Sequence, residues 1–92
     1  MSFVQVRLPG ALRTYADEQA LVDVAAGTLA EVLAALGQTH PLLLPRLLAP
    51  DGSLRPYVNV FLGADNVREL DGLATQVPPG STITILPAVA GG

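Results

Sequence analysis

The feature that most constrains the fold is an alternation of apolar and polar residues in four short segments. These segments cover residues 3–8, 20–24, 56–62 and 81–86. Successive side chains of a β-strand point to opposite faces, so this alternation predicts strands with one buried face. The residues expected to face inward are Val4, Val6, Leu8, Val22, Val24, Val58, Val60, Leu62, Ile83 and Ile85.

One segment between the second and third strands has helical spacing instead. Thr28 and Glu31 form the S/T-x-x-E pattern of a capping box, and Gly37 is expected to end the helix. Glu31 could also be read as a catalytic base, but capping explains it without a further assumption. The apolar residues that fall on one helix face are Leu29, Val32, Leu33 and Leu36. One capped helix with four or five strands predicts a small α+β domain.

The remaining segments are predicted to connect these elements. Residues 11–19 are expected to form a loop or wide turn in which Tyr15 packs against the core. The proline-punctuated residues 40–50 are expected to form a short helix or turn over the sheet edge, and residues 67–70 a short return strand. His40 is interpreted as a loop residue, because the sequence places no carboxylate beside it for acid–base chemistry.

Composition excludes several classes of function. A length of 92 residues predicts one domain, here residues 1–86. The absence of cysteine excludes disulfides, thiol catalysis and thiolate metal sites, and a single histidine cannot build a multi-histidine metal centre. All five basic residues are arginines scattered along a chain of net charge −3, so no nucleic-acid partner is expected. No apolar run approaches the roughly 20 residues of a membrane span, and no leader pattern is seen, so a cytoplasmic location without membrane partners is expected.

The last six residues are small, apolar and uncharged up to the terminal carboxylate. Proline has no N–H to donate to a sheet ladder, so strand pairing should weaken or end where this segment begins. Extended, it reaches roughly 20 Å, beyond the radius of gyration of about 12 Å expected for such a domain, so it could enter a partner. The alternative is a frayed chain end. The predicted tail consists of Pro87, Ala88, Val89, Ala90, Gly91 and Gly92, and its two glycines would let a narrow channel close around bare backbone.

The outward faces of the strands predict a docking surface beside this tail. Phe3, Tyr57, Phe61 and Leu86 are expected to face solvent near one another and near the root of the tail. A cluster of exposed aromatic and apolar side chains suggests a protein partner. The alternatives are a loop that covers this face, or a strand register shifted by one residue, which would exchange the two faces.

Three segments carry a resemblance to a known family. Residues 57–60 (Tyr-Val-Asn-Val), 71–75 (Asp-Gly-Leu-Ala-Thr) and 86–92 (Leu-Pro-Ala-Val-Ala-Gly-Gly) resemble the MoaD/ThiS sulfur carriers, and the likeness covers nearly the whole chain. The family implies a ubiquitin-like β-grasp fold, with a mixed four- or five-stranded sheet packed on one main helix. The ending is similar to CysO-type carriers and to molybdopterin synthase small subunits. Many of the latter have aromatic residues where this chain has Ile85 and Leu86, which favours the CysO type.

The resemblance also implies a mechanism. An E1-like adenylyltransferase/sulfurtransferase would bind the domain and draw in the tail, and the Gly92 carboxylate would attack the α-phosphate of ATP. Sulfide or a persulfide would then displace AMP and leave a thiocarboxylate on Gly92, which a sulfur-accepting synthase would use. The chain itself would bind no cofactor or metal and hold no catalytic residue, so it is not expected to be an enzyme.

Several alternatives remain open from the sequence. The sulfur acceptor could be an enzyme that makes cysteine, a thiazole, a thiosugar or thiolated tRNA, or it could be molybdopterin synthase. A second hypothesis is a ubiquitin-like modifier conjugated to proteins through Gly92, and a third is an interaction module with an inert tail. An enzyme is least favoured, because no nucleophile–base pair or metal cluster is apparent.

Overall fold

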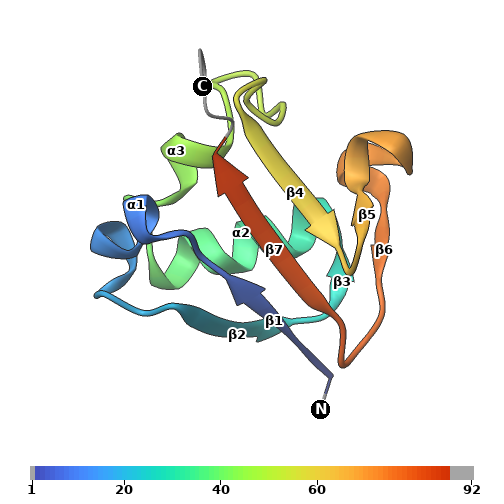
Figure 1. Cartoon of the computed structure of the whole chain (residues 1–92), viewed down its shortest axis with the longest axis horizontal. Helices are drawn as coiled ribbons and strands as arrows, with labels where there is room; N and C mark the ends of the chain where they lie inside the picture. Colours follow the sequence, from blue (N-terminus) through green and yellow to red (C-terminus); the bar gives the residue numbers. More distant parts are fainter. Residues whose placement is uncertain (1, 88–92) are drawn as a thin grey trace.

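The strands predicted from alternation lie side by side in one mixed sheet (Figure 1). The computed structural model describes residues 2–87. The sheet is built from β1 (Phe3–Arg7), β2 (Leu21–Ala25), β4 (Val58–Leu62), β5 (Asp65–Asn66) and β7 (Thr82–Pro87). Their order is β2-β1-β7-β4-β5; β1 and β7 run parallel, whereas the β1–β2, β4–β7 and β4–β5 pairs are antiparallel. The predicted α+β class and mixed sheet are confirmed.

One face of this sheet packs against the core, and the residues on that face are those that alternation predicted. Nine of the ten residues expected to face inward are buried, and Leu62 is partly buried against the core. The outward positions of β1 and β2 are exposed, which gives each strand a regular buried–exposed pattern. Since a slip of one residue would exchange the faces, the buried pattern fixes the phase of each strand.

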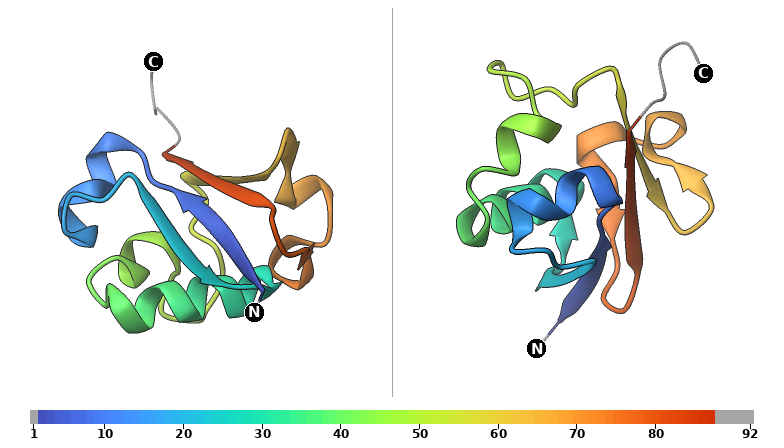
Figure 2. Two further views of the ribbon diagram at one scale, coloured as in Figure 1. Left: turned by 90° about the horizontal axis from the view of Figure 1, so that it is seen from below. Right: turned by 60° about the vertical axis from the view of Figure 1, so that its left-hand side comes forward.

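Helix α2 (Leu29–Thr39) lies across the inner face of the sheet (Figure 2, left). The predicted capping box is present: the Glu31 N–H donates to Thr28 Oγ1 at 3.2 Å, and the Thr28 N–H donates to Glu31 Oε1 at 2.9 Å. The structural role of Glu31 is therefore confirmed. The four apolar residues predicted for one helix face are all fully buried against the strands.

The expected end of this helix at Gly37 is wrong. α2 continues to Thr39 and ends at His40, whose N–H still donates to the Leu36 carbonyl. Pro41 follows, and a residue before proline is disfavoured in helical conformation, which explains the end. A Cβ on Gly37 would lie 2.9 Å from Leu44 Cδ2, so the glycine permits close packing against the next helix.

Two of the predicted connections are more regular than expected. Residues 11–19 are not simply a loop, because they contain most of α1 (Gly10–Arg13) and the 3-10 helix η1 (Thr14–Ala16). Each is at most four residues long, and the helical spacing of Leu12, Tyr15 and Ala16, which pack on the core, extends across both. The short helix expected within residues 40–50 is confirmed as α3 (Leu44–Leu47), which buries Leu47.

The segment after β4 also differs from the prediction. The return strand is β5 rather than residues 67–70; Val67–Glu69 instead form the 3-10 helix η2, which the Asn66 side chain caps by accepting a hydrogen bond from the Arg68 N–H. After η3 (Gly72–Ala74), β6 (Gln76–Val77) pairs with β3 (Gly27–Thr28) in a small second sheet that the sequence did not indicate. Within residues 2–87, no helix has the length and apolarity needed to cross a membrane.

Candidate functional site

The end of β7 is the part of the structure from which the predicted tail would continue. The parallel pairing aligns Arg7, at the end of β1, with Thr84. The antiparallel pairing aligns Asn59 with Leu86 and Val58 with Pro87. The end of β7 and the start of β4 therefore lie together at one end of the molecule, which we call the strand-end pole, and β1 ends beside the middle of β7 and points toward this pole (Figure 1).

The predicted tail falls largely beyond the described residues. β7 is described as far as Pro87, which is aligned with Val58. Ala88, Val89, Ala90, Gly91 and Gly92 lie outside the described residues. The division into a domain of residues 1–86 and a tail of residues 87–92 therefore stays a prediction.

Two of the four predicted docking residues are neighbours on the outer face of the sheet. Leu86 is 44% exposed and is aligned with Asn59. Phe61, two residues further along β4, is aligned with Thr84 and is partly buried. Diagonal neighbours on one face of an antiparallel pair lie within reach of long and aromatic side chains. Leu86 and Phe61 thus form a small apolar area on the outer face of the sheet, next to the strand-end pole.

Phe3 does not belong to this group, which corrects the expected cluster. Its side chain is exposed, but it lies at the start of β1, where its carbonyl accepts a hydrogen bond from Gly80. Leu86 is six residues beyond Gly80 on the parallel strand β7, a separation of about 20 Å at the rise of a strand. Parallel pairing places Phe3 and Leu86 at opposite ends of the sheet.

Tyr57 lies at the strand-end pole but on the helix side of the sheet. Alternation along residues 56–62 assigned it to the outer face, but β4 begins only at Val58 and Tyr57 is part of the preceding turn. It is half exposed and lines a hollow with Tyr15, Arg46 and the buried Ile85. The Arg46 guanidinium lies 4.5 Å from the centre of the Tyr15 ring, as in a cation–π contact.

Two further titratable groups have polar partners nearby in the structure. His40 is buried, and its Nδ1 lies 3.8 Å from Asp17 Oδ2, a neighbour that sequence distance concealed. Hydrogen bonds from the Ser53 hydroxyl and N–H hold the pKa of Asp51 below its usual value. Among the residues that the structure describes, no cluster of three potential metal ligands occurs.

Comparisons with known proteins agree with the resemblance. The model of the ThiS family matches residues 6–92 and so extends through both terminal glycines. The sulfur carrier protein CysO of Mycobacterium tuberculosis is 37% identical over 91 residues, which cover 97% of this chain and 98% of that protein. Small archaeal modifier protein 3 of Haloferax volcanii is 38% identical over 65 residues, which cover 71% of this chain and 70% of that protein.

A solved structure shows the same arrangement of elements. A chain in the crystal structure of the Amycolatopsis orientalis BexX/CysO complex superposes with a TM-score of 0.90 at 35% sequence identity, covering 97% of this chain and 99% of that one. The match includes the mixed five-stranded sheet with a helix across it. The chain therefore belongs to the ThiS family, with the ubiquitin-like β-grasp fold of the CysO-type sulfur carriers.

Proposed function

We propose that this chain carries sulfur as a thiocarboxylate on Gly92. The observation that supports this most directly is the family match, which runs to Gly92. The similarity to CysO over almost the full length of both chains also supports the carrier role.

The proposed chemistry needs two steps on the terminal carboxyl group. The Gly92 carboxylate is ionised at neutral pH and is a poor electrophile. It attacks the α-phosphate of ATP in the activating enzyme, which releases pyrophosphate and forms an acyl-adenylate. Sulfide then attacks the acyl carbon and AMP leaves, so that one carboxyl oxygen is replaced by sulfur. ATP is consumed on the partner, and the carrier keeps only the covalent sulfur.

The folded domain would serve as the docking surface for these partners. Leu86 and Phe61 present apolar surface on one side of the strand-end pole, and Tyr57 does so on the other. The radius of gyration of the structure is 12.0 Å, whereas a six-residue tail extends to roughly 20 Å. The tail could therefore reach a buried active site while the domain remains at the entrance. We place all catalytic groups on the partners: an E1-like activating enzyme and a sulfur-accepting synthase.

A second function, protein modification through Gly92, is favoured by one observation. The similarity to small archaeal modifier protein 3 covers 71% of this chain at an identity close to that of CysO. A modifier would form an amide bond between its terminal glycine and an amine of the target. This chain has no lysine, so it offers no side-chain amine on which such conjugates could grow into branched chains.

Intact mass spectrometry of the protein purified from its native cell tests the proposal. A carrier shows a species in which one oxygen is replaced by sulfur, and this species disappears after deletion of Gly92. Gly91→Val should leave the fold unchanged and abolish adenylation, because the added side chain would meet the walls of a narrow channel. A modifier shows conjugates of higher mass instead, and a chain without either species contradicts both functions.

A further inference from the structure

All five arginine side chains lie around the strand-end pole, although they are scattered along the sequence. Arg7 and Arg13 line a hollow together with Leu86. Arg46 and Arg55 line a second hollow together with Tyr57.

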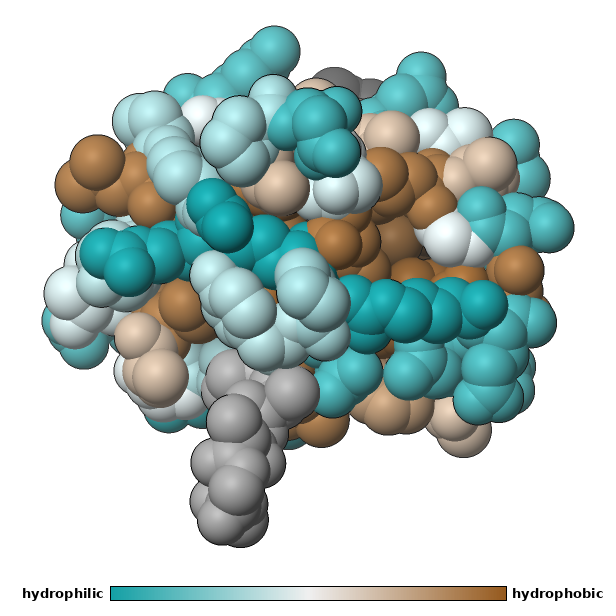
Figure 3. Space-filling view, turned by 90° about the horizontal axis from the view of Figure 1, so that it is seen from above, coloured by the Kyte–Doolittle hydropathy of each residue, from teal (hydrophilic) through white to brown (hydrophobic). Residues whose placement is uncertain are grey.

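The fifth arginine, Arg68, is fixed in the same region. Its Nη2 donates to the Arg55 carbonyl at 2.6 Å and its Nη1 to Asn59 Oδ1 at 3.2 Å, next to Leu86 in the sheet. Figure 3 looks onto this end of the molecule, where strongly hydrophilic side chains flank an apolar area. We call the five residues the arginine collar; they are Arg7, Arg13, Arg46, Arg55 and Arg68.

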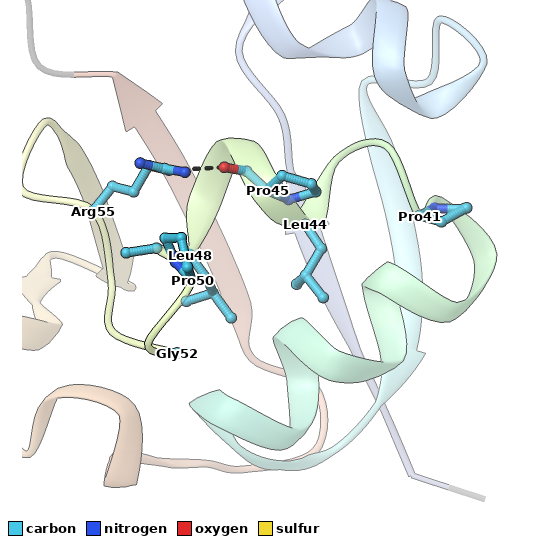
Figure 4. A pocket seen from close by; sticks show the side chains of 8 residues that line it. Pro41, Leu44, Pro45, Leu48, Pro50, Gly52 and Arg55 are labelled. Atoms are coloured by element: carbon cyan, nitrogen blue, oxygen red, sulfur yellow. Dashed lines mark hydrogen bonds between the residues drawn. The ribbon is translucent and has the colours of Figure 1, made fainter.

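No guanidinium of the collar forms a salt bridge within the described part of the chain. Arg13 Nε donates to the Leu8 carbonyl, and Arg55 Nε donates to the Pro45 carbonyl at 2.7 Å (Figure 4). The other acceptors are also neutral: the Arg55 carbonyl and Asn59 Oδ1. Within residues 2–87, the one carboxylate within 4 Å of a basic side chain is that of Asp17, beside His40.

The eight acidic residues contribute nothing to the hollows that the collar lines in the described structure. Asp65 is aligned with Leu62, at the far end of β4, and Asp23 with Gln5 in the middle of β1. Glu31 is engaged in the capping box. In this chain of net charge −3, the five arginines thus lie around one end and form no salt bridge within residues 2–87, although Glu69 follows Arg68 in η2 and Asp51 lies in the turn before Arg55.

We propose that the arginine collar docks against a rim of carboxylates at the entrance of the activating enzyme's tail channel. This inference rests on the proposed function, because it assumes that the tail enters such a channel. Opposite charges across an interface speed association and align the partners. The bonds to neutral acceptors hold several guanidinium groups in place in advance, which reduces the entropy lost on docking.

A protein rim fits the collar better than a nucleic acid does. The calculated isoelectric point is 4.7, far below the values above about 9 that are typical of nucleic-acid-binding domains. Exposed apolar residues, Leu86 and Tyr57, also lie among the guanidinium groups. Apolar anchors beside charged groups are typical of protein–protein interfaces.

The test is the KM of the carrier for its E1-like enzyme in ATP–pyrophosphate exchange, measured at two salt concentrations. Going from about 0.1 M to about 1 M NaCl shortens the electrostatic screening length from about 10 Å to about 3 Å. We expect KM of the natural chain to rise about tenfold with kcat nearly constant, because collar contacts act on association. The double variant Arg7→Gln/Arg46→Gln should raise KM by a similar factor at low salt and remove most of the salt dependence.

A matched control separates position from net charge. Ala30→Glu/Gln76→Glu changes the net charge by the same two units, at exposed positions near the opposite end of the sheet. The control should leave KM unchanged. If loss of the Arg46–Tyr15 contact unfolds the double variant, Arg7→Gln is compared with Gln76→Glu alone. All variants are checked by thermal melting before the kinetics.

The outcomes distinguish the collar from the carrier function. If ATP–pyrophosphate exchange occurs with a KM that does not change with salt, the proposed docking role of the collar is wrong and the carrier function is unaffected. Equal effects of the collar and control variants on KM would lead to the same conclusion. An absence of exchange with the natural chain overturns both. Binding of bulk tRNA as tightly as the enzyme, measured by fluorescence anisotropy, would assign the collar to nucleic acid and overturn the protein rim.

Discussion

Ile85 and Leu86 are adjacent on β7 but face opposite sides of the sheet, which makes them a matched pair for testing the structure and the site together. Ile85 is fully buried and aligned with Val60, whereas Leu86 is 44% exposed and aligned with Asn59. Replacing each with alanine removes a similar volume of side chain. The two variants should therefore differ mainly in what each side chain contacts.

The expected losses of stability follow from burial. Ile85→Ala leaves a cavity between the sheet and the helices, and such substitutions cost about 2–5 kcal/mol. Leu86→Ala removes about three methylene-sized groups that are roughly half buried, which amounts to about 1 kcal/mol at about 0.8 kcal/mol per buried group. For a domain of this size, a loss of 1 kcal/mol lowers the melting temperature by about 4–8 °C. A loss of about 3 kcal/mol in Ile85→Ala would thus lower it by about 12–24 °C.

Ile85→Ala should have the larger effect on stability, whereas Leu86→Ala should have the larger effect on partner binding. Leu86→Ala should raise the KM for adenylation about tenfold, which corresponds to about 1.4 kcal/mol, because an apolar contact at the rim of the tail channel is lost. Ile85→Ala should leave KM within about twofold when assayed well below its melting temperature. Circular dichroism melts and pyrophosphate exchange on the same preparations give both quantities. Equal destabilisation by both variants would refute the strand register, and an unchanged KM in Leu86→Ala would refute its docking role.

Three further predictions concern the body of the domain. Thr28→Ala removes the capping box and should cost about 1 kcal/mol in urea unfolding, whereas Thr14→Ala, at an exposed site, should cost less than about 0.5 kcal/mol. Gly37→Ala should be close to neutral in thermal melting, since about 1 kcal/mol of helix propensity offsets displacement of Leu44, whereas the branched Gly37→Val should destabilise by about 1–3 kcal/mol. Asp51 has a lowered pKa in the folded state, so its contribution to stability is present above the usual carboxyl value of 3.8 and is lost as pH falls through the folded pKa. Ser53→Ala should move the NMR-detected titration of Asp51 upward toward 3.8, and an unshifted titration would contradict the role of the Ser53 hydroxyl.

The parts of the fold that were predictable from sequence are those set by local contacts. The inward residues of the four long strands follow from alternation, and the start of α2 follows from two residues three positions apart. The parts that were missed depend on distant contacts. Gly37 could have ended a helix, but instead its missing side chain makes room for Leu44 of α3. The small β3–β6 sheet joins segments about 50 residues apart, and two-residue strands carry no periodicity.

In the candidate site, too, the features set by local pattern were predictable and those set by distant contacts were not. The diagonal placement of Leu86 and Phe61 on one face follows from alternation once β4 and β7 are known to pair. The distance between Phe3 and Leu86 depends on whether β1 and β7 run parallel or antiparallel. The pattern within either strand does not specify this direction, because it is set by the topology of the whole sheet. Tyr57 was misplaced because the alternating pattern continues one residue beyond the point where the strand begins.

The arginine collar shows why charge counted along the sequence misleads in this fold. Arg7 ends β1, Arg13 ends α1, Arg46 lies in α3, Arg55 precedes β4 and Arg68 follows β5. Parallel pairing with β7 points the carboxyl end of β1 toward the pole, and antiparallel pairing with β7 places the amino end of β4 at the pole. Residues at the ends of unrelated elements therefore become neighbours around the strand from which the tail continues. A basic surface at this position need not leave any basic run in the sequence, so topology has to be known before nucleic-acid or protein partners are inferred from charge.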